Sequence, residues 1–319
     1  MNSILKTVAL VGMGLLCAPV FAADAQPARP GTVNYVEGAT YLQGKQLNSH
    51  DVGSVEMNSG QVLTTGAGKA EILLTPGVFL RVDQNSTVKM ISPEITPTQV
   101  ELDHGRAAVE VDEIYKQNDL EITDAGITTH LAKDGYYEFD ADHPTAMVFK
   151  GEAVVDEGDG KYQNLKAHHE IALVDGAREK PAKFNTNDTQ DNLYKWSSLR
   201  SQYLAEANNQ IAGQYASMAG FDPGWYWDPY MWDYTFIGAG PFWSPFGYGF
   251  YPPWGWYGMY WRGGFYGSRY YDHGRYDNHG FVGHDGGGFH DGGGFHGNGG
   301  FHGGAGGGFH GGGGGGGHR

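Results

Sequence analysis

Two apolar runs separated by a Pro-Gly pair make up residues 70–82, which read AEILLTPGVFLRV. Each run has the length of a β-strand, and Pro76-Gly77 is a dipeptide typical of a tight turn. The pattern predicts a β-hairpin with one strand at 70–74 and the other at 78–82. We expect Leu73 and Val82 to be core positions.

Outward from this hairpin, short apolar runs alternate with turn residues at spacings of roughly 8 to 12 residues. No part of residues 31–182 shows the 3.6-residue period of a helix. The expected strands cover residues 32–36, 70–74, 78–82, 87–91, 99–102, 107–111, 120–123, 127–130, 136–139, 146–150, 153–156 and 170–174. This indicates a mainly β domain at 31–182, either a β-sandwich or a short β-solenoid. We expect residues 27–183 to fold alone.

Several of these runs, taken together, resemble the FecR domain family. Residues 33–38, 60–66, 70–82 and 148–154 stand in the order that the family shows, across roughly 130 residues. The resemblance implies an extracytoplasmic β-domain. FecR-like transducers also carry an iron-uptake signal to a cytoplasmic anti-sigma region, which requires a cytoplasmic helical segment and a transmembrane helix. The sequence shows neither, so envelope signalling is kept only as an alternative function.

Residues 1–22 have the pattern of a secretory signal peptide. Lys6 supplies a positive charge, an apolar stretch runs over residues 8–16, and Val20-Phe21-Ala22 has small residues at the cleavage positions. The apolar stretch is too short to span a membrane. Cys17 follows Leu16, which is larger than a lipidation signal allows. We expect cleavage near Ala22, a periplasmic or secreted protein, and no transmembrane helix in the mature chain.

The charge balance argues against nucleic acid as a partner, and we expect none. The net charge is −15, and residues 23–190 carry 27 Asp and Glu against 14 Lys and Arg, whereas phosphate binding needs clustered cations. Motifs for catalysis are weak. Gly66-Ala67-Gly68-Lys69 lacks the spacing of a phosphate loop and is interpreted as a hairpin turn. No nucleophile elbow, zinc-protease helix motif or catalytic cysteine occurs, so we expect no enzymatic activity and no required cofactor.

Residues 188–215 change to a helical period. Asp188 or Thr189 is the expected N-terminal cap, and Gly213 or Gly220 is the expected end. The helix would either pack on the β-domain or bind a partner. The apolar positions of its expected stripe are Leu193, Trp196, Tyr203, Leu204, Ala207 and Ile211.

An aromatic Gly/Pro-rich region follows at 221–279. Between residues 221 and 261, 19 of 41 side chains are Phe, Trp or Tyr, an area that would be adhesive if it were left uncovered. Three interpretations are open. The region folds back as an irregular cover on the β-domain, it contacts the envelope by stacking on glycan rings or lying at a membrane interface, or it drives self-association.

Residues 280–319 form a Gly/His-rich tail in which 23 of 40 residues are glycine. Such a composition predicts a disordered segment, because glycine loses much backbone entropy on ordering and offers no side chain to bury. A flexible chain can still wrap several imidazoles around Zn, Ni or Cu. The candidate metal ligands are His284, His290, His296, His302 and His310.

These features together favour a non-enzymatic protein outside the cytoplasm. We expect it to bind or scaffold at the cell envelope, with an envelope protein or a glycan as the unidentified partner. A metal-binding or metal-buffering protein that works through its histidines is the alternative from another functional class.

Overall fold

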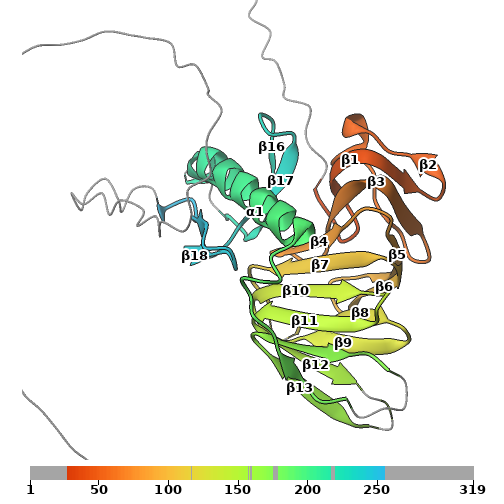
Figure 1. The fold of residues 1–319 in the computed structure, drawn as a ribbon. Helices are drawn as coiled ribbons and strands as arrows, with labels where there is room; N and C mark the ends of the chain where they lie inside the picture. Colours follow the sequence, from red (N-terminus) through yellow and green to blue (C-terminus); the bar gives the residue numbers. More distant parts are fainter. Residues whose placement is uncertain are drawn as a thin grey trace, which may run out of the picture. The chain divides into compact units, whose positions relative to one another are not determined.

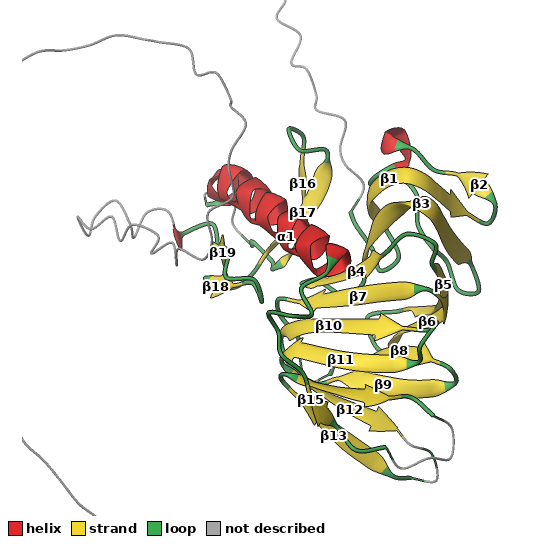
Figure 2. Ribbon diagram, in the orientation of Figure 1, coloured by secondary structure: helices red, strands yellow, loops and turns green. Residues whose placement is uncertain are grey.

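The computed structural model describes residues 27–255 except 116, 157, 159, 175–178 and 217–219. The expected signal peptide with its cleavage position near Ala22, residues 256–279 of the aromatic region and the Gly/His-rich tail lie outside the described residues. Within them the chain is mainly β with one α-helix, which confirms the predicted fold class (Figures 1 and 2).

Every strand expected from the sequence overlaps an observed strand. The sheet comprises β1 (Val33–Leu42), β2 (Lys45–Gln46), β3 (Val62–Leu73), β4 (Val78–Val82), β5 (Thr87–Pro93), β6 (Thr98–His104), β7 (Arg106–Val111), β8 (Leu120–Asp124), β9 (Ile127–Leu131), β10 (Gly135–Asp140), β11 (Thr145–Lys150), β12 (Glu152–Asp156), β13 (Tyr162–Lys166), β14 (His169–Ala172) and β15 (Ala182–Lys183). A short 3₁₀ helix, η1 (Ser49–Asp51), follows β2. The strand β13 was not expected, because its sequence YQNLK has a single apolar side chain that is buried.

The long strand β3 joins the two halves of one folded sheet. Residues Ala70 to Leu73 pair with β4, whereas Val62 to Thr64 pair with β5. Beyond these partners, one half runs β4-β7-β10-β11-β14-β15 and the other runs β5-β6-β8-β9-β12-β13. The halves lie as two layers (Figure 1). The half with β4, β7, β10 and β11 is called the first layer, and the half with β5, β6, β8 and β9 is called the second layer. The result is a β-sandwich. As the chain proceeds, new strands are added to the same end of both layers, as in the successive turns of a solenoid.

Glycines form the corners at which the chain crosses from one layer to the other. Gly105, with a φ of 71°, separates β6 from β7, which belong to different layers. Gly151, with a φ of 103°, does the same between β11 and β12. A Cβ atom at Gly151 would lie 2.2 Å from the Tyr137 hydroxyl oxygen. Glycine is therefore required there for its backbone conformation and for space.

The expectation of a hairpin turn at Gly66–Lys69 was wrong, because these residues lie inside β3. Gly68 pairs with Gly38 of β1, and a Cβ atom at Gly68 would lie 2.3 Å from the carbonyl oxygen of Glu37. The glycines thus serve the close approach of two strand backbones and do not reverse the chain.

Leu73 and Val82 are both fully buried, as expected, but they lie in different clusters. Val82 belongs to the main core between the two layers, with residues from almost every strand of the sheet. Leu73 lies on the outer face of the first layer, where it packs with Phe79 and with Leu204 and Phe236 from the C-terminal part of the chain. The domain thus has a second apolar face that later residues cover.

That cover begins with the helix α1 (Asn192–Ile211), which continues as a 3₁₀ turn, η2 (Ala212–Tyr215). The cap is neither Asp188 nor Thr189 but Asp191, whose carboxylate accepts a hydrogen bond from the backbone N–H of Tyr194. The predicted stripe is only partly buried, since Tyr203 is exposed and Trp196 is half-buried. Polar side chains occupy much of the buried face instead, namely Ser197, Arg200, Ser201 and Asn208.

The described part of the aromatic region folds back over α1 and the outer face of the first layer. It forms two hairpins, β16 (Gly224–Asp228) with β17 (Asp233–Ile237), and β18 (Phe242–Trp243) with β19 (Gly249–Phe250). Phe236 and Phe250 are fully buried beside Leu73. For residues 221–255 the interpretation as a folded cover is therefore correct.

Candidate functional site

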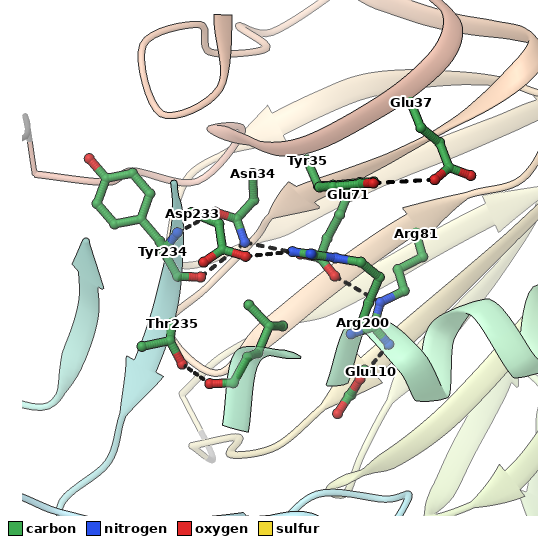
Figure 3. Close-up of polar contacts among 11 residues, drawn as sticks. Asn34, Tyr35, Glu37, Glu71, Arg81, Glu110, Arg200, Asp233, Tyr234 and Thr235 are labelled. Atoms are coloured by element: carbon green, nitrogen blue, oxygen red, sulfur yellow. Dashed lines mark hydrogen bonds and ion pairs between the residues drawn. The ribbon is translucent and has the colours of Figure 1, made fainter. Parts of the chain in front are cut away.

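A buried network of charged side chains holds α1 and β17 on the first layer (Figure 3). Its base is formed by Glu71, Arg81 and Glu110 from the neighbouring strands β3, β4 and β7, and all three side chains are fully buried. The Arg81 guanidinium donates to the Glu71 carboxylate over 2.9 Å and also to Glu110. Each charge is paired, as burial requires.

Arg200 carries the network from the helix to the hairpin. Its Nη2 atom lies 2.9 Å from Glu71 Oε1 and 2.9 Å from Asp233 Oδ2 at the start of β17. The guanidinium also lies 4.2 Å from the ring centroid of Tyr35, a cation–π contact. Ser201, one residue further along α1, donates to Glu110 over 2.6 Å.

A second tie comes from Asn34 on β1. Its side-chain amide donates to Glu71 and to the carbonyl oxygen of Tyr234, both over 3.0 Å. Its carbonyl oxygen accepts the backbone N–H of Tyr234 over 2.7 Å. The amide thus gives β17 the hydrogen bonds of an additional strand neighbour.

The charges of the network stabilise the ionised form of Glu71. Burial by itself raises the pKa of Glu71, but the guanidinium groups of Arg200 and Arg81 outweigh burial and lower this pKa to about 2. Burial raises the pKa of Asp233 to about 6 even though Arg200 opposes the shift. Glu71 therefore stays ionised at every physiological pH, and it fixes the position of α1.

On its solvent-facing side, α1 forms one wall of an open groove of about 790 Å³, and β19 contributes to the other wall. Among the described residues that line the groove, Glu206 is the only charged one, and amide side chains predominate. The lining residues are Gln202, Ala205, Glu206, Asn209, Gln210, Gly213, Gln214, Tyr248 and Gly249.

The wall formed by β19 is held by the buried amide of Asn208. Its carbonyl oxygen accepts the backbone N–H of Tyr251 over 2.8 Å, and its NH₂ group donates to the carbonyl oxygen of Phe236 over 3.0 Å. Phe242 and Phe250 stack behind the wall with ring centroids 4.8 Å apart. These contacts fix the position of β19 relative to α1.

Trp243 flanks this wall and is 68% exposed. It pairs directly with Gly249, and a Cβ atom at Gly249 would lie 3.2 Å from the indole ring. The groove thus combines amide donors and acceptors with a large exposed aromatic face. This combination suits a ligand that has many hydroxyl groups and flat C–H faces.

Sequence analysis did not find the groove. The available signal was the polar stripe Gln202, Glu206 and Asn209, which recurs at helical spacing. The predicted metal ligands His284, His290, His296, His302 and His310 lie outside the described residues. A different set of possible ligands, Asp119, Glu121 and His130, is brought together in the described part of the chain.

Comparisons with known proteins give distant likenesses only. No protein-family model matches the chain, and no curated protein matches it. Two crystal structures of a candidate anti-sigma factor from Parabacteroides distasonis ATCC 8503 are similar, with TM-scores of 0.34 and 0.33 and sequence identities of 13% and 15%. The matches cover 44% and 43% of this chain, and 64% and 62% of the other chains, which is less than two thirds of their length.

In the described part of the chain, no helix combines the length and the apolar character that crossing a bilayer demands.

Proposed function

We propose that this protein is a non-enzymatic binding protein of the cell envelope, located outside the cytoplasm, and that the groove along α1 binds envelope glycan. The observation that carries the proposal is the amide-lined groove together with the exposed indole of Trp243, which lies beside the groove because Trp243 is the strand partner of the lining residue Gly249. Asn and Gln side chains both donate and accept, so they match the vicinal hydroxyl groups of a sugar. An indole face packs well against the C–H face of a pyranose ring.

The composition of the groove favours binding over cleavage. Glycoside hydrolysis ordinarily needs two carboxyl groups placed on either side of the bond. Among the described lining residues, Glu206 is the only carboxylate. One carboxylate among amides can accept hydrogen bonds from sugar hydroxyls, but it has no partner that would act as the second catalytic group.

The location outside the cytoplasm rests on the signal-peptide pattern of residues 1–22 and on the FecR-like resemblance. Two alternatives remain predictions. Envelope signalling rests on that resemblance, and metal buffering rests on the histidines of residues 280–319.

Co-sedimentation with insoluble peptidoglycan sacculi, followed by competition with soluble N-acetylglucosamine oligomers, tests the proposal. We expect saturable binding by the full mature chain and about a tenfold loss of affinity in Trp243→Ala, which corresponds to roughly 1.4 kcal/mol. The matched control is Trp232→Ala, because Trp232 is 66% exposed but lies in the β16–β17 turn, whereas Trp243 is paired with the groove residue Gly249. Absent binding, or equal binding by the two variants, contradicts the proposal.

A further inference from the structure

Three metal-ligating side chains meet on the outer face of the second layer. Glu121 of β8 stands directly opposite His130 of β9 in the antiparallel register. Asp119 precedes Glu121 by two positions, so it points to the same side of the strand. Leu120 and Ile122, which alternate with them, are buried in the core between the layers. The β8–β9 register thus brings Glu121 and His130 together, and Asp119 joins them from the position just before β8.

The spacing of their donor atoms is that of a coordination shell. His130 Nδ1 lies 3.3 Å from Asp119 Oδ1 and 3.5 Å from Glu121 Oε1. The three side chains each offer a ligand atom within 4.8 Å of the others. For metal–ligand bonds of about 2.1 Å, the edge of a coordination tetrahedron is about 3.4 Å. Without a cation these contacts are a hydrogen bond and an ion pair of the imidazole with two carboxylates, and the same spacing fits one shared cation.

Neighbouring groups orient these ligands. Gln99 of β6, which is paired with Glu121 in the parallel register, donates from Nε2 to Glu121 Oε2 over 2.7 Å. The other oxygen, Oε1, is the one that faces His130. The carbonyl oxygen of Asp119 accepts the backbone N–H of Thr98 over 2.8 Å, which fixes the start of β8. Hydrogen bonds of this kind set ligand orientation in metal sites.

The geometry points to a binding site for one divalent transition-metal cation, of the zinc type, held by Asp119, Glu121 and His130. One imidazole and two carboxylates suit Zn²⁺, Ni²⁺ or Mn²⁺ better than an all-oxygen site would. The side chains of Asp119 and His130 remain partly accessible, so the cation can enter and water can complete its coordination. This site is independent of the groove and of the histidines in residues 280–319.

Binding of Zn²⁺ to the full chain tests the inference, in a background where all eight histidines from His273 to His318 are replaced by serine. Isothermal titration with ZnCl₂ is expected to show one ion per chain, and saturating Zn²⁺ is expected to raise the Tm, because the site exists only in the folded state. His130→Gln is expected to weaken binding at least tenfold.

The matched control is His143→Gln. His143 is an exposed histidine whose Nδ1 lies 3.5 Å from one carboxylate, that of Asp140. It should bind Zn²⁺ as the background does. If His130→Gln lowers the Tm without metal, Asp119→Asn replaces it, because that side chain is about half exposed. The inference fails if the background shows no one-to-one binding, or if the variants at positions 119 and 130 bind as tightly as the control.

Discussion

Arg200 of α1 and Glu71 of β3 are 129 positions apart in the chain, and their side chains meet over 2.9 Å with almost no exposure to solvent. This pair, with Asp233 on the other side of the guanidinium, joins the β-sandwich to the segment that builds the groove. The charges are costly to bury singly and stable when paired, so helix, hairpin and sheet depend on one another.

Arg200→Met should destabilise the protein strongly. The substitution leaves Asp233 buried without its cation and Glu71 with Arg81 alone, and we expect a loss of about 3 to 5 kcal/mol in the free energy of unfolding. Urea denaturation followed by far-UV circular dichroism measures it. The control is Lys45→Met, whose side chain is 76% exposed and pairs with Asp51 at 3.8 Å. That change should cost less than about 0.5 kcal/mol. Similar losses in both variants would mean that the buried pair contributes nothing special.

Truncation after Lys183 should weaken the β-domain. The sequence favours independent folding of residues 27–183, but in the structure Leu73 and Phe79 of the outer face are covered by Leu204 and Phe236. Removing the cover exposes these apolar side chains together with the buried Arg81. We expect a lower Tm and concentration-dependent association relative to a chain that ends after residue 255. Calorimetry and light scattering measure the difference, and equal Tm values would show that the cover adds no stability.

Stability should fall as the pH rises from about 4.5 to 7, and Glu138 should account for part of the fall. Burial raises the pKa of this carboxyl from 4.5 to about 7, although Arg106 opposes the shift. The folded state therefore holds the proton more tightly than the unfolded state does. The resulting stabilisation is present below pH 4.5 and is lost as the pH rises through 7. Its size is at most about 3 kcal/mol.

Glu138→Gln isolates this contribution, because glutamine does not titrate. Relative to the variant, the wild-type protein should lose stability across that pH range, as measured by urea denaturation at several pH values. Glu71, whose pKa is lowered to about 2 in the folded state, is present in both proteins, so its own contribution cancels in the difference. A difference between the two proteins that does not change with pH would refute the assignment.

Gly151→Ala should be more harmful than Gly126→Ala. Both glycines have a positive φ, 103° and 78° respectively, so both substitutions introduce backbone strain of about 1 to 2 kcal/mol. At Gly126 a Cβ atom would meet nothing within 4 Å, whereas at Gly151 it would lie 2.2 Å from the Tyr137 hydroxyl. We expect Gly151→Ala to cost at least 1 kcal/mol more. Thermal unfolding compares the two variants. Equal Tm values would mean that a Cβ atom at position 151 is accommodated without a steric cost.

Local sequence patterns were sufficient to predict most strands of the sheet. Alternating or continuous apolar residues between turn residues determine where a strand can form, and neither depends on distant partners. The pattern failed where local and tertiary signals differ. Residues 66–69 look like a turn because they contain two glycines, yet the glycines serve strand pairing with β1. The strand β13 was missed because its exposed polar side chains give no apolar period.

The candidate sites depend on contacts that no local pattern records. Arg200, Ser197 and Ser201 interrupt the apolar stripe of α1 and look like surface residues, but partners from β3, β7, β10 and β17 make their burial favourable. The groove exists only because the chain returns to α1 at β19, where Tyr251 donates to Asn208, a residue 43 positions earlier in the helix. His130 meets Asp119 only through the β8–β9 register. The amino-acid sequence alone determined the β-rich class and most strand positions, since hydrophobic periodicity acts within a few residues. Tertiary structure decided which polar side chains are buried and which meet at a surface, because pairing a charge or orienting a ligand requires groups that lie far apart in the chain.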